Sequence, residues 1–274
     1  MKAAALRSDG PNDSSVAKAL ALLDCFGSSE RSLGVTEMAR RAGLPKSTVH
    51  RLAGVLVDSG YLERSEDGRY QLGIHLFELG HRVTAAGTIR RRASPLLHEL
   101  SRVTGETSHL AILDGDDVVY LEKVDGSYAF DVPSQVGHRN PAVATAVGKA
   151  ILAWRSRHEL QRLASRGLPV YTSRSLQSVD SLLREAQEIR RTNQAMDDEQ
   201  RAVNLVCMAA PVRDRGGKVV AGVSVAGVRE RLTTGRQVEL AAHLQIAASR
   251  ISTSLGFRHR SQSAEGPARP SVAG

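Results

Sequence analysis

The sequence is poor in cysteine and contains no long apolar run. Cys25 and Cys207 are the only cysteines among 274 residues, and they lie in separate apolar stretches far apart in the chain. This pattern argues against a disulfide framework and predicts two buried, reduced thiols. No apolar run approaches the length of a membrane span, and the N-terminus lacks the apolar core of a secretion signal. We therefore expect a cytoplasmic location.

Residue patterns typical of catalysis and of metal binding are also missing. None of the nine histidines stands at metal-ligand spacing from a Cys, Asp or Glu. The sequence has no Gly-x-Ser-x-Gly elbow, and Cys207 has no obvious histidine partner. Gly148-Lys149 is not a phosphate-binding loop, because no glycine lies five residues earlier and Ala150 replaces the required hydroxyl. We expect no catalytic residue, no metal site and no cofactor.

The net charge of +8 suits a polyanionic partner, but its distribution weakens that argument. Residues 1–82 carry 11 Lys and Arg against 10 Asp and Glu, so most of the positive excess lies in residues 83–274. The informative charge is local, because residues 40–51 contain Arg40, Arg41, Lys46 and Arg51 and no acid. Such a cluster is what phosphate neutralisation requires.

That cluster lies in a predicted helix–turn–helix. Residues 35–42 form a short helical pattern, Gly43 provides a turn position with positive φ, and a second helix is expected from about Lys46 to Ser59. Val49 and Leu52 would pack the second helix onto the first. The exposed N-terminal end of this helix would present side chains to bases and phosphates. These candidate DNA contacts are Lys46, Ser47, Thr48, His50 and Arg51.

A predicted hairpin follows directly and completes a winged helix–turn–helix. Residues 61–64 and 69–72 read as two strands around the turn Ser65-Glu66-Asp67-Gly68. On this wing, Arg64 and Arg69 are second-rank candidates for contact with the DNA backbone or minor groove. The alternative is an ordinary helical hairpin with a solvated charged face.

The C-terminal half reads as strand pairs interleaved with helices. Expected strand pairs are 107–113 with 118–124 and 206–213 with 218–226, and expected helices begin near Ser94-Pro95 and cover 144–154, 178–192 and 238–255. This order predicts a mostly antiparallel sheet with helices against it, and thus an α+β fold class. The predicted organisation is a flexible N-terminus (1–13), a winged helix–turn–helix domain (14–73), a linker helix (74–92), a C-terminal α+β domain (93–257) and a disordered tail (258–274).

Several blocks of the sequence resemble the IclR (isocitrate lyase regulator) family of bacterial transcriptional regulators. The blocks are GLPKSTVHRL, GYLERSEDGRYQLG, TGETSHLAILDG, VGHRNPAVATAVGKAILA, AMDDEQ, VCMAAPVRDRGGKVV and SVAG, and they span nearly the whole chain. The resemblance implies a winged helix–turn–helix followed by an effector domain with a GAF/PAS-like sheet. It also implies homodimers or homotetramers that bind double-stranded promoter DNA. A small-molecule effector, often an organic acid or an aromatic compound, is a further implication.

The resemblance places ligand contacts in the TAVGKA loop, the acid of AMDDEQ, the cysteine before MAAPV and the serine of SVAG. These candidate effector-binding residues are Thr145, Ala146, Gly148, Asp197, Cys207 and Ser224. The opening of a helix at 145–148 would favour an anion such as a carboxylate. Two departures from the family, Ala226 in place of a second serine and Glu199-Gln200-Arg201-Ala202-Val203 in place of Glu-Asn-x-x-Gly, point to a larger or less polar effector.

Three function hypotheses remain open at this stage. The first is an effector-responsive transcriptional regulator, a repressor or alternatively an activator, whose ligand shifts the balance between DNA-competent and DNA-incompetent states. The second is an enzyme acting on a small acid and carrying a DNA-binding appendage, for which the sequence supplies no catalytic constellation. The third is a DNA-organising protein without sequence preference, which would need no pocket.

Overall fold

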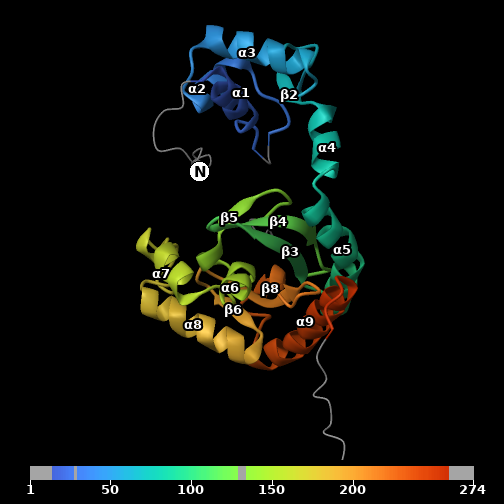
Figure 1. The fold of residues 1–274 in the computed structure, drawn as a ribbon, viewed down its shortest axis with the longest axis vertical. Helices are drawn as coiled ribbons and strands as arrows, with labels where there is room; N and C mark the ends of the chain where they lie inside the picture. Colours follow the sequence, from blue (N-terminus) through green and yellow to red (C-terminus); the bar gives the residue numbers. More distant parts are fainter. Residues whose placement is uncertain (1–13, 28–29, 129–133, 259–274) are drawn as a thin grey trace, which may run out of the picture. The chain divides into compact units, whose positions relative to one another are not determined.

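The computed structural model describes residues 14–27, 30–128 and 134–258. The predicted flexible N-terminus lies outside these residues, as does all of the predicted disordered tail except Arg258. Contacts divide the chain into two compact units, residues 1–87 and 88–274 (Figure 1). The predicted linker contains a helix, α4, and the first turns of the next helix, α5, with Arg82 and Val83 between them.

The first unit is a winged helix–turn–helix. Its elements are α1 (Ser15–Leu23), α2 (Val35–Ala42), α3 (Lys46–Asp58), β1 (Leu62–Arg64), β2 (Tyr70–Leu72) and α4 (Ile74–His81). The turn between α2 and α3 depends on Gly43, which has a φ of 65° and donates its amide to Ala39. Val49 and Leu52 are buried in the core that α1, α2 and α3 share with the wing, as their spacing predicted. Cys25 is buried in this core and carries a free thiol.

The second unit contains a six-stranded antiparallel sheet in the order β5-β4-β3-β8-β7-β6. The strands are β3 (Thr107–Asp114), β4 (Asp117–Val124), β5 (Arg139–Pro141), β6 (Ala195–Asp198), β7 (Leu205–Arg213) and β8 (Val219–Val228). The helices are α5 (Thr84–Thr104), the 3₁₀ turn η1 (Ala142–Ala144), α6 (Ala146–Leu152), α7 (Arg157–Ser165), α8 (Val179–Thr192) and α9 (Thr234–Ser254). The predicted mixed helix-and-sheet architecture is confirmed.

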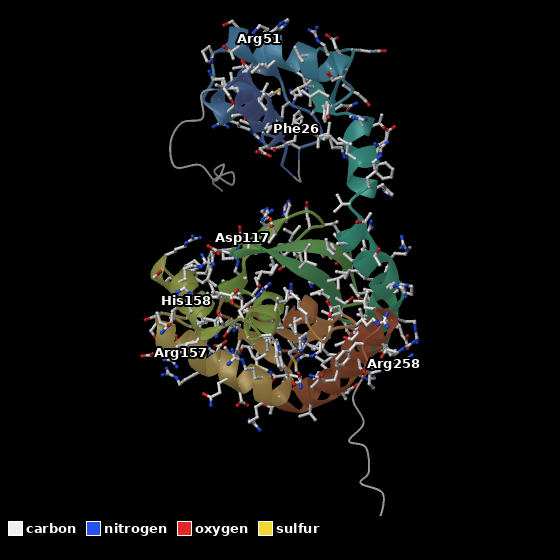
Figure 2. The ribbon with its side chains drawn as sticks, in the orientation of Figure 1. Phe26, Arg51, Asp117, Arg157, His158 and Arg258 are labelled. Carbon is white, nitrogen blue, oxygen red and sulfur yellow. The ribbon has the colours of Figure 1, made fainter. Side chains whose placement is uncertain are left out.

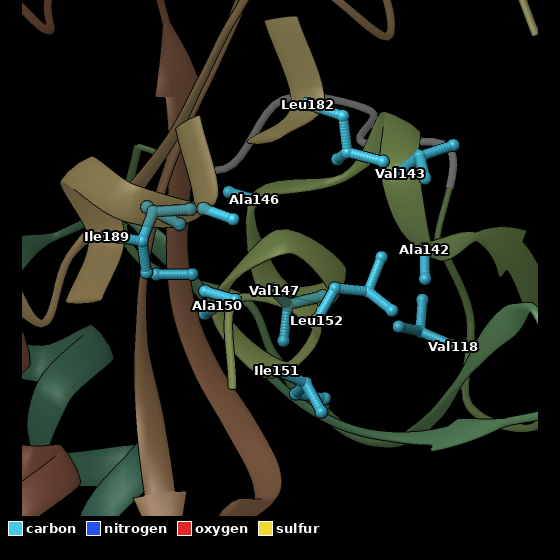
Figure 3. Close-up of a cluster of buried hydrophobic side chains, with 14 of the residues drawn as sticks. Val118, Ala142, Val143, Ala146, Val147, Ala150, Ile151, Leu152, Leu182 and Ile189 are labelled. Carbon is cyan, nitrogen blue, oxygen red and sulfur yellow. The ribbon is translucent and has the colours of Figure 1, made fainter. Parts of the chain in front are cut away.

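Helices cover both faces of this sheet, so the sheet lies between two hydrophobic cores (Figure 1). Leu110 and Met208 point into the core formed with α5 and α9, whereas the neighbouring residues Ala111 and Ala209 point into the core formed with α6, α7 and α8. This alternation follows from the two-residue period of a strand. In the core formed with α6, α7 and α8, Ala146 and Ala150 of α6 lie beside Ile189 of α8 (Figure 3).

Three local predictions differ from the structure. The helix expected to begin near Ser94-Pro95 begins ten residues earlier, so Pro95 lies inside α5. Proline has no N–H and removes one helical hydrogen bond, but packing of residues on both sides of it, Ala93 and Leu97, retains the helix. The expected helix 144–154 is the shorter α6, which follows η1. Helix α7 and strands β5 and β6 were not predicted as elements.

Candidate functional site

The N-terminal end of α3 is an exposed, polar surface. Lys46, Ser47, His50 and Arg51 are exposed and Thr48 is half-buried. Within the described part of the chain, no hydrogen bond or ion pair involves any of these side chains. Pro45, the residue before the helix, forms no side-chain cap, so the first amides of α3 remain available to an anion. Figure 2 shows Arg51 on this helix.

The cations of α2 contribute less charge than the local count suggested. Arg40 pairs with Glu37 at 2.6 Å, and Arg41 pairs with both Glu30 (2.5 Å) and Glu37 (2.6 Å). The hydrogen bonds from both arginines hold the pKa of Glu37 at about 2. Residues 40–51 contain no acid, but folding brings acids from outside this segment into contact with Arg40 and Arg41. Lys46 and Arg51 therefore carry the unpaired positive charge of this surface.

The two arginines of the wing differ in their surroundings. Arg64 lies over the ring of Tyr70, with its guanidinium carbon 5.9 Å from the ring centre, and is exposed. Arg69 donates hydrogen bonds to the hydroxyl (2.9 Å) and the carbonyl (2.7 Å) of Ser32. Arg69 therefore ties the wing to the segment before α2, and part of its donor capacity is already used.

A cavity of about 30 Å³ lies in the second unit, between the sheet and the start of α6. Its walls are formed by His109, Tyr120, Ser134, Asn140, Thr145, Ala146, Val147, Asp197, Arg201, Leu205, Cys207 and Ser224. Five of the six predicted effector residues are in this set, and Gly148 is not. A volume of this size holds a water molecule, so an organic effector requires the walls to move apart.

Strand pairing brings these distant residues together. Asp197 on β6 is directly opposite Cys207 on β7, and His109 on β3 is directly opposite Ser224 on β8. Opposite residues on antiparallel strands have neighbouring side chains. Ala226, which replaces a family serine, does not line the cavity and instead packs with Cys207 in a small apolar cluster.

Asp197 is the one acidic side chain of the cavity wall. It is only 1% exposed, and its Oδ1 accepts hydrogen bonds from the amides of Gln200 (2.7 Å) and Arg201 (3.2 Å). Burial raises the pKa of this carboxyl, while the Lys149 charge and the two amide hydrogen bonds oppose the increase. Burial also raises the pKa of the Cys207 thiol well above its ordinary value, which keeps the thiol protonated.

The cavity also contains residues that sequence reasoning missed, namely His109, Tyr120, Asn140 and Arg201. Burial lowers the pKa of His109 to about 3, so its ring is neutral, and its Nε2 lies 2.7 Å from Ser134 Oγ. Burial raises the pKa of Tyr120 to about 12. The two-residue period of strand β3 puts His109 and Ala111 on one face of the sheet, and the sequence contains this pattern. The pattern alone does not indicate a cavity on that face.

The start of α6 is organised by its own side chains. Thr145 is the N-cap, and its Oγ1 accepts a hydrogen bond from the Gly148 amide at 3.1 Å. Lys149 is 1% exposed, and its Nζ donates to Glu185 (2.6 Å), Gln200 and the carbonyl of Met196. The ammonium of Lys149 is thus held by protein groups, in agreement with the rejection of a phosphate-binding loop.

Gly148 has a packing role that requires a glycine. A Cβ at this position would lie 2.2 Å from the carbonyl oxygen of Ala142. Replacing Gly148 with alanine is therefore expected to destabilise the fold by about 1–3 kcal/mol or more, as overpacking does. Thermal unfolding would measure the loss, with Gly87→Ala as the control because a Cβ there meets nothing within 4 Å. Equal melting temperatures for Gly148→Ala and the control would contradict the packing role.

No group of three or more His, Cys, Asp or Glu side chains among the described residues could hold a metal ion. In the same part of the chain, no helix is both long and apolar enough to cross a membrane.

Comparison with known proteins identifies both units. Residues 15–66 match the IclR helix-turn-helix domain, and residues 81–253 match the family described as bacterial transcriptional regulator IclR C-terminal. The chain belongs to the IclR family. As a member it is a DNA-binding transcriptional regulator with a ligand-binding C-terminal domain, and the prediction that it is not an enzyme is confirmed by the nature of its relatives.

Relatives of known name cover nearly the whole chain. The regulator KdgR of Escherichia coli is 38% identical over 89% of this chain and 93% of its own length. The transcriptional repressor IclR of E. coli is 30% identical over 88% of this chain and 90% of its own length. A crystal structure of an IclR homologue from Microbacterium hydrocarbonoxydans, complexed with 4-hydroxybenzoate, superposes with a TM-score of 0.82 at 26% identity, covering 88% of this chain and 99% of that one.

Proposed function

We propose that this IclR-family protein represses transcription by inserting the start of α3 into the major groove of operator DNA. The observation that carries the proposal is the set of exposed side chains at the start of α3, free of partners in the described chain and next to uncapped amides. Lys46, Ser47, Thr48, His50 and Arg51 are the proposed contacts, and Arg64 and Arg69 extend them from the wing. Repression, rather than the alternative of activation, is favoured because the relative IclR of E. coli is named a repressor.

We propose that the protein acts as a homodimer, or as a homotetramer built from dimers. Helix α4 supports this proposal, because none of its eight residues is buried in the single chain. Its Ile74 and Phe77 are 62% and 63% exposed, and Val16 and Leu20 on α1 are also exposed. Exposed large apolar side chains of this kind mark association surfaces. A two-fold dimer would place two α3 helices in successive major grooves of a near-palindromic site.

We further propose that a small organic acid or aromatic compound binds in the cavity and changes operator affinity. The cavity supports this because it brings apolar surface and several convergent polar side chains together in one place, as ligand sites do. The bound 4-hydroxybenzoate of the M. hydrocarbonoxydans homologue is an example of this chemical class. Candidate contacts are Thr145, Ala146, Asp197, Cys207 and Ser224. Since the partner is bacterial promoter DNA, we place the protein in the cytoplasm.

The test is a DNA-binding titration with the full-length protein. The duplex from upstream of its own gene should bind at least 100-fold more tightly than a scrambled duplex at moderate ionic strength, and an effector acid should change that ratio. Equal affinity for both duplexes, with and without acids, would contradict a regulator and would instead fit a DNA-organising protein. Turnover of the added acids would support the enzyme hypothesis.

A further inference from the structure

Arg201 is the one lysine or arginine in the cavity wall, and its side chain has an unusual set of neighbours. Its guanidinium carbon lies 3.9 Å from the centre of the Tyr171 ring, and its Nη2 donates to Asn140 Oδ1 at 3.2 Å. Its Nε is buried without a hydrogen-bond partner, the only buried side-chain nitrogen or oxygen of the described residues in that state. A buried donor without an acceptor costs free energy that a ligand can recover.

The charge of Arg201 is also uncompensated within the described chain. No carboxylate there lies within 4.0 Å of its guanidinium, whereas the nearby Arg174 and Arg229 both pair with Asp198 and Glu199. Asp197, the acid of the cavity, uses its Oδ1 for backbone amides and forms no ion pair with Arg201. A cation in a cavity wall whose buried Nε–H has no acceptor is suited to an anion that enters the cavity.

We infer that Arg201 is the residue that binds the acid group of the effector, and that it makes the site selective for carboxylates over neutral analogues. This inference rests on the proposed function, because it assumes that the effector occupies the cavity. The carboxylate would accept hydrogen bonds from Nε and Nη2 side by side, the geometry that guanidinium and carboxylate share. When the ligand binds, the hydrogen bond from Nη2 to Asn140 would be replaced by a charge-assisted hydrogen bond from Nη2 to the carboxylate.

This assignment differs from the sequence-based expectation, which put the anion at the start of α6. That helix has seven residues, and the Gly148 amide is already bonded to its cap Thr145. Arg201 offers a full charge and an unused donor, so the acid group binds at the Arg201 side of the cavity. A hydroxyl elsewhere on the ligand then faces Asp197 and Ser224.

The experiment compares acids with their amides on the full-length protein. Benzoate, 4-hydroxybenzoate, pyruvate and succinate would each be paired with the corresponding amide, and binding would be read from the melting temperature and by calorimetry. We expect one or more acids to bind the wild type and their amides to bind at least tenfold more weakly. Arg201→Gln should weaken acid binding by about 10- to 100-fold, and Arg201→Lys should show an intermediate loss.

Arg213→Gln is the matched control. Arg213 also stacks on an aromatic ring, with its guanidinium carbon 3.8 Å from the centre of the Trp154 ring, but it does not line the cavity. The control should bind the acids as the wild type does. Arg201→Gln should melt within a few degrees of the wild type without ligand, because the Arg201 side chain forms one hydrogen bond and no ion pair within the described residues.

Three results would overturn the inference. One is an amide that binds as tightly as its acid, and another is wild-type affinity for the acids in Arg201→Gln. Either would leave effector binding, and hence the proposed function, in place. The third is the absence of any acid-induced change in the wild type, which contradicts the acid assignment while the DNA-binding titration independently decides the proposed function.

Discussion

Replacing Arg51 with alanine is expected to weaken operator binding by roughly 5- to 150-fold, while the protein keeps its fold. Arg51 is exposed on α3 and has no partner among the described residues, so its loss removes no intramolecular bond. A specific arginine contact with a base or a phosphate contributes about 1–3 kcal/mol, which converts to this range. Fluorescence anisotropy with the upstream duplex would measure the affinity, and thermal unfolding would check the fold.

Arg82→Ala provides the control for this change. Arg82 is also exposed and lies in the same unit, at the end of α4, so both variants lose one positive charge. A general electrostatic effect would weaken both variants alike, whereas a direct contact weakens Arg51→Ala selectively. Equal affinities of the two variants for the duplex would show that Arg51 does not contact the DNA directly. If Arg51 contacts a phosphate, its loss should also reduce the slope of log K against log salt concentration by about one.

The first unit was predictable because its signals are local in sequence. The helix predicted over residues 35–42 is α2 with the same bounds, and the predicted second helix differs from α3 by one residue at its C-terminal end. Gly43 adopts the positive φ that its place in the turn required. A short turn between two amphipathic helices leaves few alternative arrangements, so spacing alone defines this structure.

The charge of that unit was not predictable in the same way. Arg40 and Arg41 are close to Lys46 in sequence, but their ion pairs involve Glu30 and Glu37. A count over a sequence window omits acids that the fold brings near. The exposed cationic surface is therefore smaller than the count implied, and the argument for DNA contact depends on Lys46 and Arg51.

The cavity required long-range information that spacing does not contain. Family resemblance identified Asp197 and Cys207, but it also selected Gly148, whose role in the structure is close packing against Ala142. Arg201 was noted only as part of a departure from the family pattern. Its importance comes from an unpartnered Nε, a property that appears only when its neighbours are placed in three dimensions.

The cavity wall is linked to the helices behind it by a continuous polar network. The amide of Gln200 donates to Asp197, and the Gln200 side chain bonds both Lys149 and Glu185. If a ligand changes the position of Asp197, we expect the change to reach α6 and α8 through Gln200. Buried polar networks of this kind cost stability unless every member is satisfied. We therefore expect a trade-off between the stability of the domain and its response to a ligand.

Asp197→Asn is the variant that should separate these two properties. The asparagine side chain has the same shape and keeps an oxygen that accepts hydrogen bonds from the backbone amides of Gln200 and Arg201. It removes the buried negative charge. We expect a higher melting temperature than the wild type at pH 7.5, together with a smaller shift on binding of a hydroxylated acid such as 4-hydroxybenzoate, because the ligand hydroxyl loses its charged acceptor. Asp198→Asn is the control, since Asp198 pairs with Arg174 and Arg229 and its loss should lower stability or leave it unchanged.

The pH dependence follows from the raised pKa of Asp197. Because the folded protein holds this proton more tightly than the unfolded chain, ionisation of Asp197 destabilises the fold. This destabilisation is absent below the ordinary pKa of 3.8, develops as the pH rises through the folded-state pKa, and is complete above it. The difference in melting temperature between Asp197→Asn and the wild type should therefore grow from acid to neutral pH. A difference that shrinks over this range would show that the carboxylate stabilises the cavity wall.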